Sequence, residues 1–236
     1  MHFPSPLVTG TLVRRYQRFL ADVRLDSGDT VVAHCPNTGS MLGLNAPGNR
    51  VWLSPAANPA RKLAWTWEMV SADASPEVRV GIHTGRANAL VGEALDAGLI
   101  DELAGFTERR AEARLGARSR TDWLLAYPDG EAYVEVKSVT AAVQEGVGRF
   151  PDAVSERASK HMAELAHVVQ TGGRAAVVFC VQRADVTAVG PADTIDPVFG
   201  AALRQAASRG VELYALGADL SDTEIRLVRR LPVLLE

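Results

Sequence analysis

The stretch RTDWLLAYPDGEAYVEVKSV, residues 120–139, contains two acidic residues and a lysine whose types and spacing could do chemistry together. Side chains alternate along a β-strand, so Glu135 and Lys137 share one face of their strand while Val136 points to the other. Asp122 lies on the preceding strand of a predicted hairpin. Metal-assisted phosphodiester cleavage needs one or two carboxylates for the cation and a positive charge near the phosphate. The trio therefore predicts a Mg²⁺- or Mn²⁺-dependent site; a solvated surface pair is the simpler alternative.

The register of the hairpin decides whether the two acids meet. Its turn, YPDG, has Pro and Gly where a β-turn favours them. If Ala126 pairs with Glu131, Asp122 lies opposite Glu135 on one face, whereas a three-residue loop places the acids on opposite faces. We predict the first register, which puts Lys137 beside both carboxylates.

Further polar residues could border this site. Glu93 falls in a predicted helix and could bring a third carboxylate to the metal, although its position off the apolar stripe also fits a solvated side chain. Lys160 and His161 fall on the polar side of a later helix, where exposure is the simpler interpretation. Gln182 closes the apolar run VVFCV and needs a partner there, either a metal-bound water or a backbone group.

The elements that position these residues belong to the second half of the chain, where helices and strands alternate. A helix is predicted over 88–99, capped by Asn88, and another starts at Pro151 and buries Val154 and Leu165. The other expected elements are a strand within 103–116, an apolar strand over 174–183, a helix over 196–210, a strand over 211–220 and a closing strand in the tail 230–236. This order predicts an α/β domain over residues 81–236.

The first half reads differently, as short β segments separated by Gly, Pro, Asn and Asp turns. The segments are 11–25, 29–35, 49–55 and 63–70. Strands of this length and spacing predict a small OB-fold barrel over residues 1–80.

Cations and aromatic rings interleave in this first half. Cations bind phosphates whatever the base sequence, and exposed rings stack on bases. The predicted DNA contacts are Arg14, Arg15, Tyr16, Arg18, Arg61 and Lys62, with Lys160 in the second half. Phe19, Trp52 and one of Trp65 and Trp67 are predicted to be core, because alternation sends half of a strand inward.

Composition sets the limits of the function. The 236 residues are 47% hydrophobic and carry a net charge of −3, which excludes a uniformly basic nucleic-acid coat and leaves only local binding. No apolar run approaches the roughly 20 residues that cross a bilayer, and the start lacks a signal-peptide pattern, so a cytoplasmic protein is expected. Cys35 and Cys180 lie in no metal-binding spacing and are predicted to be buried thiols.

Longer blocks carry a family resemblance. AHCPNTGSMLGL, NALVGEAL, YVEVKSVT and FPDAVSERASKH resemble, in order and over essentially the whole chain, the sugar fermentation stimulation protein A family. The resemblance implies an N-terminal OB-fold domain, a nuclease-like second domain, and a cytoplasmic bacterial or archaeal DNA-binding protein linked by name to the regulation of sugar (maltose) metabolism.

Within these blocks, Asp122, Glu135, Val136 and Lys137 look like the PD-(D/E)xK nuclease signature. In that signature the two acids and the backbone carbonyl between acid and lysine hold the metal, so Val136 is implied as a third ligand. Thr121 stands where the signature often has proline.

Two hypotheses follow. The first is a metal-dependent nuclease that uses Mg²⁺ or Mn²⁺, and the second is a non-catalytic DNA-binding transcriptional regulator of sugar metabolism. The intact acid, acid and lysine set favours the nuclease, because a pure binder has no need to hold two carboxylates near a phosphate that they repel. The expected partner is DNA, single-stranded or structured rather than a defined duplex site, with no membrane and a possible homodimer.

Overall fold

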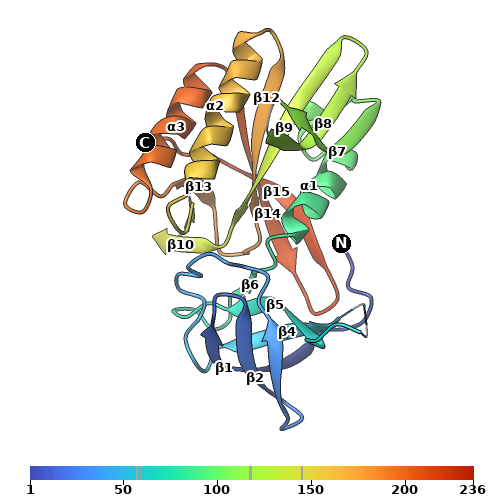
Figure 1. The fold of residues 1–236 in the computed structure, drawn as a ribbon, viewed down its shortest axis with the longest axis vertical. Helices are drawn as coiled ribbons and strands as arrows, with labels where there is room; N and C mark the ends of the chain where they lie inside the picture. The colour runs from blue at the N-terminus through green and yellow to red at the C-terminus, as the bar shows by residue number, and fades with distance from the viewer. Residues whose placement is uncertain (57, 59, 117–118, 145) are drawn as a thin grey trace.

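The computed structural model describes residues 1–56, 58, 60–116, 119–144 and 146–236. Figure 1 shows an all-β N-terminal domain below an α/β domain, joined through the segment that follows β6. Across the described ranges, no helix is long and apolar enough to span a membrane.

The N-terminal domain is a closed barrel. Its five strands are β1 Val8–Tyr16, β2 Leu20–Leu25, β3 Thr30–His34, β4 Arg50–Pro55 and β5 Trp65–Ser71. They follow the order β3-β2-β1-β4-β5, and a parallel pairing of β3 with β5 closes the barrel. A short strand β6, Arg79–Gly81, adds to β5. Alternate side chains such as Leu12, Val23, Leu53 and Trp67 fill the interior, as the period of a half-buried strand requires.

The segment 11–25, predicted as one strand, is two strands joined by a tight turn. Gln17 and Arg18 have φ of 49° and 64° in this turn. The reversal interrupts the alternation, so Phe19 does not reach the core as predicted but is 46% exposed. Trp52 and Trp67 are buried as expected.

A six-stranded sheet forms the centre of the second domain. Its strands are β7 Glu108–Leu115, β8 Ser119–Tyr127, β9 Gly130–Val139, β12 Arg174–Val181, β14 Glu212–Leu220 and β15 Ile225–Leu231. They follow the order β15-β14-β12-β9-β8-β7, with β9, β12 and β14 parallel and the outer pairs antiparallel.

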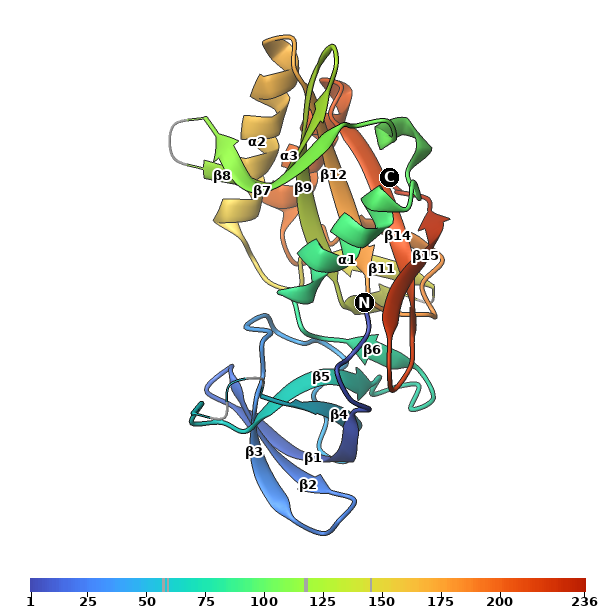
Figure 2. The same cartoon turned by 90° about the vertical axis from the view of Figure 1, so that its right-hand side faces the viewer.

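Helices cover both faces of this sheet (Figures 1 and 2). Helix α1, Arg86–Asp96, packs with Val134, Val136 and Val178 on one face. Helices α2, Glu156–Gln170, and α3, Pro197–Ser208, pack with Val177 and Phe179 on the other. Because Glu135 and Lys137 alternate with Val134 and Val136, they face α2.

Smaller elements complete the domain. Strands β10 Ala141–Gln144, β11 Val147–Phe150 and β13 Ala188–Pro191 form a second sheet, and η1, Asp101–Leu103, follows α1. After β15, Val233 makes a parallel bridge to Val189. Both Cys35 and Cys180 are free and buried, as predicted.

The first helix starts earlier than its predicted cap. Helix α1 begins at Arg86, after Gly85. Asn88 therefore lies inside the first turn, and its side-chain amide donates to Asp122.

The second helix starts later than predicted. Ser155 is its N-cap and accepts a hydrogen bond from the Ala158 N–H at 3.2 Å. Asp152 cannot serve as the cap because its carboxylate accepts from Ser40 and Met41 of the barrel. Val154 consequently precedes the helix and is 73% exposed rather than buried.

Candidate active site

The candidate site lies where β8 separates from β9. The hairpin has the predicted register, with Ala126 opposite Glu131, and its ladder extends to Trp123. Beyond that point Asp122 replaces the ladder with a side-chain contact: its Oδ2 accepts from the backbone N–H of Val136 at 2.7 Å. The gap between the strands thus gives a carboxylate access to the middle of β9.

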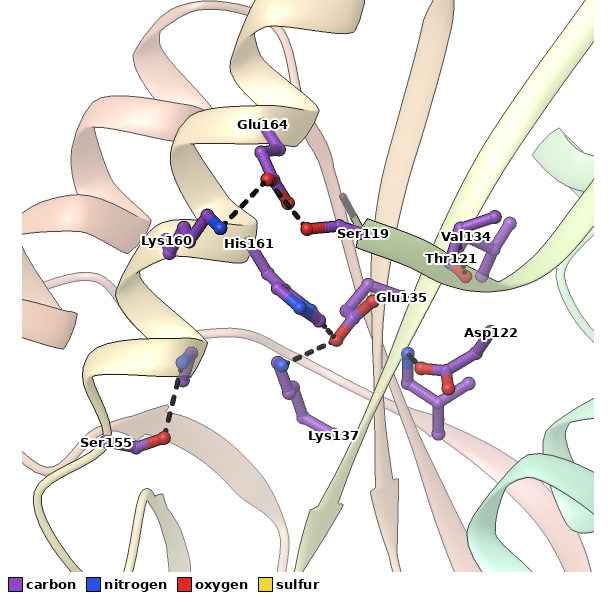
Figure 3. A network of polar contacts seen from close by, with 12 residues as sticks. Ser119, Thr121, Asp122, Val134, Glu135, Lys137, Ser155, Lys160, His161 and Glu164 are labelled. Atoms are coloured by element: carbon purple, nitrogen blue, oxygen red, sulfur yellow. Dashed lines mark hydrogen bonds and ion pairs between the residues drawn. The ribbon is translucent and has the colours of Figure 1, made fainter. Parts of the chain in front are cut away.

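Asp122 is held from two sides. Asn88 on α1 donates to its Oδ1 at 2.7 Å, while Val136 donates to Oδ2. Burial raises the pKa of Asp122, and the negative charge of Glu135 raises it further. The two carboxylates therefore interact electrostatically, although Asp122 accepts from the Val136 N–H and Figure 3 shows Glu135 directed at Lys137 and His161.

Glu135 has an asymmetric set of partners. Lys137 Nζ lies 2.7 Å and His161 Nδ1 2.5 Å from the same oxygen, Oε1 (Figure 3). The second oxygen, Oε2, is buried and has no hydrogen-bond partner among the described residues. Burial by itself raises the pKa of Glu135, but the His161 hydrogen bond and the Lys137 charge together hold that pKa below its ordinary value.

This donor set fits a divalent cation. A buried carboxylate oxygen without a partner is costly, and a cation that shares it with Asp122 would relieve both the missing contact and the repulsion between the acids. Hard cations such as Mg²⁺ bind through one or two carboxylates and complete their shell with water. Within the described ranges, no group of three or more His, Cys, Asp or Glu side chains could hold a metal. Water and backbone oxygens, such as the predicted Val136 carbonyl, would supply the remaining ligands.

The structure does not bring Glu93 to these acids. Its carboxylate pairs with the Met1 ammonium at 2.6 Å and is half exposed. The same ammonium donates to the Ile225 carbonyl, so the pair lies beside β15.

Sequence reasoning missed the role of His161. It was predicted to be exposed, but it is only 5% exposed and contacts Glu135. Ala158, Met162 and Leu165 are buried on the same helix. A spacing of i, i+3, i+4 and i+7 defines one helical face, and His161 lies at i+3 from Ala158. This pattern in the sequence could have predicted that His161 is buried.

Gln182 is fully buried, and its amide nitrogen contacts a side-chain hydroxyl instead of the predicted backbone group. Its Nε2 lies 3.3 Å from the Ser138 hydroxyl, and its Oε1 has no partner among the described residues. A Cβ at Gly81 would lie 2.7 Å from that Oε1, so Gln182 packs closely against the end of the barrel.

The predicted barrel contacts are largely engaged within the chain. Arg14 pairs with Asp22 at 2.7 Å, and the Tyr16 hydroxyl donates to the same carboxylate. Arg15 Nη2 donates to the carbonyls of three residues, Arg18, Asn37 and Gly39.

The other predicted DNA contacts differ in whether their side chains have partners within the chain. Arg61 donates to Thr66 at 3.0 Å, whereas Lys62 is exposed. Lys160 is exposed and lies 3.8 Å from Glu164. Arg18 is exposed, and its guanidinium makes no hydrogen bond or ion pair within the described part of the chain.

Two hollows border the candidate site. An interdomain cleft of about 410 Å³ is lined by Arg18 and by Lys137. A depression of about 520 Å³ is lined by Arg157, Lys160 and His161. Since Lys137 and His161 bind the same oxygen of Glu135, that carboxylate lies between the two hollows.

The fold defines a class: a closed OB barrel joined to an α/β domain with a six-stranded sheet. Residues 13–82 match the SfsA N-terminal OB domain, and residues 85–224 match the sugar fermentation stimulation protein RE domain. The chain belongs to the sugar fermentation stimulation protein family, and the predicted fold class is confirmed.

Relatives match over their full length. The chain is 56% identical to the sugar fermentation stimulation protein homolog of Halorhodospira halophila, covering 99% of this chain and 98% of the relative. The homolog of Geobacter sulfurreducens is 54% identical, covering 99% of each chain. A solved structure, Pyrococcus furiosus SfsA in complex with Ca²⁺, has a TM-score of 0.88 and 28% identity, covering 99% of this chain and 98% of that one.

Proposed function

We propose that this protein is a metal-dependent deoxyribonuclease. The observation that carries the proposal is the arrangement around Glu135: Lys137 and His161 both contact Oε1, while Oε2 is buried without a hydrogen-bond partner among the described residues. In addition to burial, the negative charge of Glu135 raises the pKa of Asp122. A purely structural ion pair would gain from using both oxygens. The Pyrococcus furiosus relative, solved with Ca²⁺, supports a divalent cation in this fold.

Asp122 and Glu135 would hold the cation, with Mg²⁺ or Mn²⁺ as the working ions. When bound, such an ion neutralises the scissile phosphate and activates a water molecule. Asn88 and the Val136 N–H fix the Asp122 carboxylate, which lowers the cost of organising the site.

Lys137 provides the positive charge. Its ammonium is fixed by Glu135 and lines the cleft, so it can stabilise the negative charge that develops on the phosphate during attack. His161 holds the other side of Glu135 and acts as a positioning residue.

One observation favours the second candidate function, a DNA-binding regulator that does not cut. Glu135 is ion-paired with Lys137 and contacts His161, which is an arrangement that a structural network also adopts. The predicted cytoplasmic location and homodimer remain part of either proposal.

The test is cleavage of single-stranded, duplex and branched DNA with Mg²⁺ or Mn²⁺, by the wild type and by Asp122→Asn. Asparagine keeps the shape, and its oxygen still accepts from Val136, so folding is preserved. Asp96→Asn is the matched control because it removes the same charge from a half-exposed carboxylate that pairs with Arg109.

We expect products from the wild type and from Asp96→Asn but none from Asp122→Asn. Products in all three proteins, or DNA binding without products under either metal, would reject the nuclease and leave the regulator.

A further inference from the structure

The interdomain cleft is built by two loops from different domains. Asn37, Thr38 and Gly39 of the barrel line one side, and residues 150–155 line the other. Asp152 joins the two loops, because its carboxylate accepts from the Met41 N–H at 3.1 Å and its carbonyl accepts from Ser40 at 2.7 Å. The cleft therefore has a fixed shape that both domains determine.

The charged groups of the cleft suit a phosphate. Its charged lining residues are Arg18, Lys137 and Asp152. The single acid is engaged with the barrel loop, whereas the Arg18 guanidinium has no partner within the described residues. An unpaired arginine over a polar cleft is a ready phosphate contact.

Arg15 holds Arg18 in place. One nitrogen of Arg15, Nη2, donates to the Arg18 carbonyl at 2.8 Å and to the Asn37 and Gly39 carbonyls at 2.9 Å. These contacts tie the β1–β2 turn to the loop that lines the cleft. Arg15 thus supports the cleft instead of contacting DNA itself.

The opposite wall suits a base. Phe150, Pro151 and Val154 line the cleft, and Val154 is largely exposed although it is apolar. Bases stack on rings and pack against apolar side chains in single-strand binding sites, with little dependence on sequence. Phosphate-binding and base-binding surfaces therefore face the same hollow.

The size of the cleft limits its occupant. Its volume, about 410 Å³, falls in the range of sites that enclose one small molecule, which corresponds to roughly one nucleotide and not to a duplex. Its lining includes Val136 and Lys137, which belong to the candidate site.

We propose that the interdomain cleft binds one unpaired nucleotide of a DNA strand, with its phosphate at Arg18 and its base against Phe150, Pro151 and Val154. The inference rests on the proposed function and specifies its substrate as single-stranded DNA. The adjoining phosphate along the strand then lies at Lys137.

Binding in Ca²⁺ tests this inference separately from cleavage. We would measure fluorescence anisotropy of a single strand of about 12 nucleotides and of a blunt hairpin duplex of the same sequence. The variants are Arg18→Ala and Thr38→Glu, which adds a carboxylate at an exposed lining position. Arg24→Ala is the matched control, since it removes an exposed arginine from the same β-hairpin.

Arg18→Ala should weaken single-strand binding about tenfold and lower the slope of log K against log salt by about 0.7. Thr38→Glu should weaken single-strand binding at least as much, and Arg24→Ala should not. The duplex should bind less tightly than the single strand and be insensitive to both cleft variants.

Unchanged single-strand affinity in both cleft variants, with thermal melts like that of the wild type, would overturn the inference. An equal loss for single strand and duplex would also overturn it. Absence of cleavage together with a selective loss of single-strand binding would reject the nuclease but support the cleft.

Discussion

The two domains use their charged side chains in different ways. In the barrel, Arg14 and Arg15 reach acceptors of their own chain, an aspartate in one case and three carbonyls in the other. In the second domain, Glu135, Lys137 and His161 are buried together, yet one oxygen of the Glu135 carboxylate has no partner in the part of the chain that the structure describes. Charge alone therefore does not mark a binding residue.

This difference shows that the free hydrogen-bonding capacity of a charged group is the better guide to its function. A guanidinium nitrogen can be engaged by carbonyls, as Nη2 of Arg15 is, or the guanidinium can lack a partner among the described residues, as in Arg18. A buried carboxylate with one free oxygen retains the capacity to bind a cation.

The largest effect should come from Lys137→Met, which removes the ammonium and keeps most of the side-chain volume. We expect cleavage to fall by about 100-fold or more, because the charge developing on the phosphate loses its stabilising partner. Ca²⁺ binding, followed by calorimetry, should persist. Lys62→Met, on the barrel surface, is the control variant. Full cleavage activity in Lys137→Met, equal to that of Lys62→Met, would contradict a role of Lys137 in cleavage.

His161→Ala should have the next largest effect. Without the Nδ1 contact, Glu135 can rotate and use both oxygens on Lys137, so Ca²⁺ affinity should fall by about 10- to 100-fold. His161→Asn should restore part of the loss, because its amide nitrogen can take the place of Nδ1.

His167→Ala on the exposed side of the same helix is the matched control for this comparison. Ca²⁺ affinities that are the same in His161→Ala and His167→Ala, measured by calorimetry, would refute a positioning role.

Within the barrel, the free energies of unfolding of Arg15→Ala and Arg14→Ala can be compared. Arg15→Ala should lower the free energy of unfolding by about 1 to 2 kcal/mol, because three carbonyls lose a charged donor. Arg14→Ala removes an exposed ion pair and should cause no resolvable change. Urea denaturation measures both, and equal losses would contradict the distinction between them.

The smallest effect is a pH dependence of stability in the metal-free protein. The folded state raises the pKa of Asp122, through burial first and then through Glu135. Folded protein therefore binds this proton more tightly than unfolded chain, so stability falls as pH rises from the ordinary value of 3.8 through the raised one.

Asp122→Asn lacks this proton, so its stability should equal that of the wild type in strong acid and exceed it at neutral pH without metal. Adding Ca²⁺ should raise the melting temperature of the wild type only. Urea unfolding across pH in a chelating buffer measures the first part, and a wild type that is more stable at neutral pH without metal would contradict it.

Much of the fold could be predicted from the sequence because it depends on local patterns of turn residues and apolar residues. Turn residues and strand spacing predicted the barrel, and the apolar run over 174–183 predicted the central strand β12. The hairpin register followed from its turn, since loop length fixes the pairing. Helix starts were less accurate: the second helix was predicted to start at Pro151, but it begins at Glu156, and the Asp152 carboxylate accepts from a loop of the other domain.

The sequence by itself determined the two domain types, the strand that places Glu135 and Lys137 on one face, and the hairpin register that pairs Ala126 with Glu131. These features depend on neighbours in the chain. Only the tertiary structure decided that His161 contacts Glu135 and that two distant loops line one cleft. It also decided that Arg15 donates to carbonyls of its own chain while the Arg18 guanidinium has no partner among the described residues. Each of these is a contact between segments far apart in sequence, and no local periodicity encodes which polar groups remain unpaired once such segments pack.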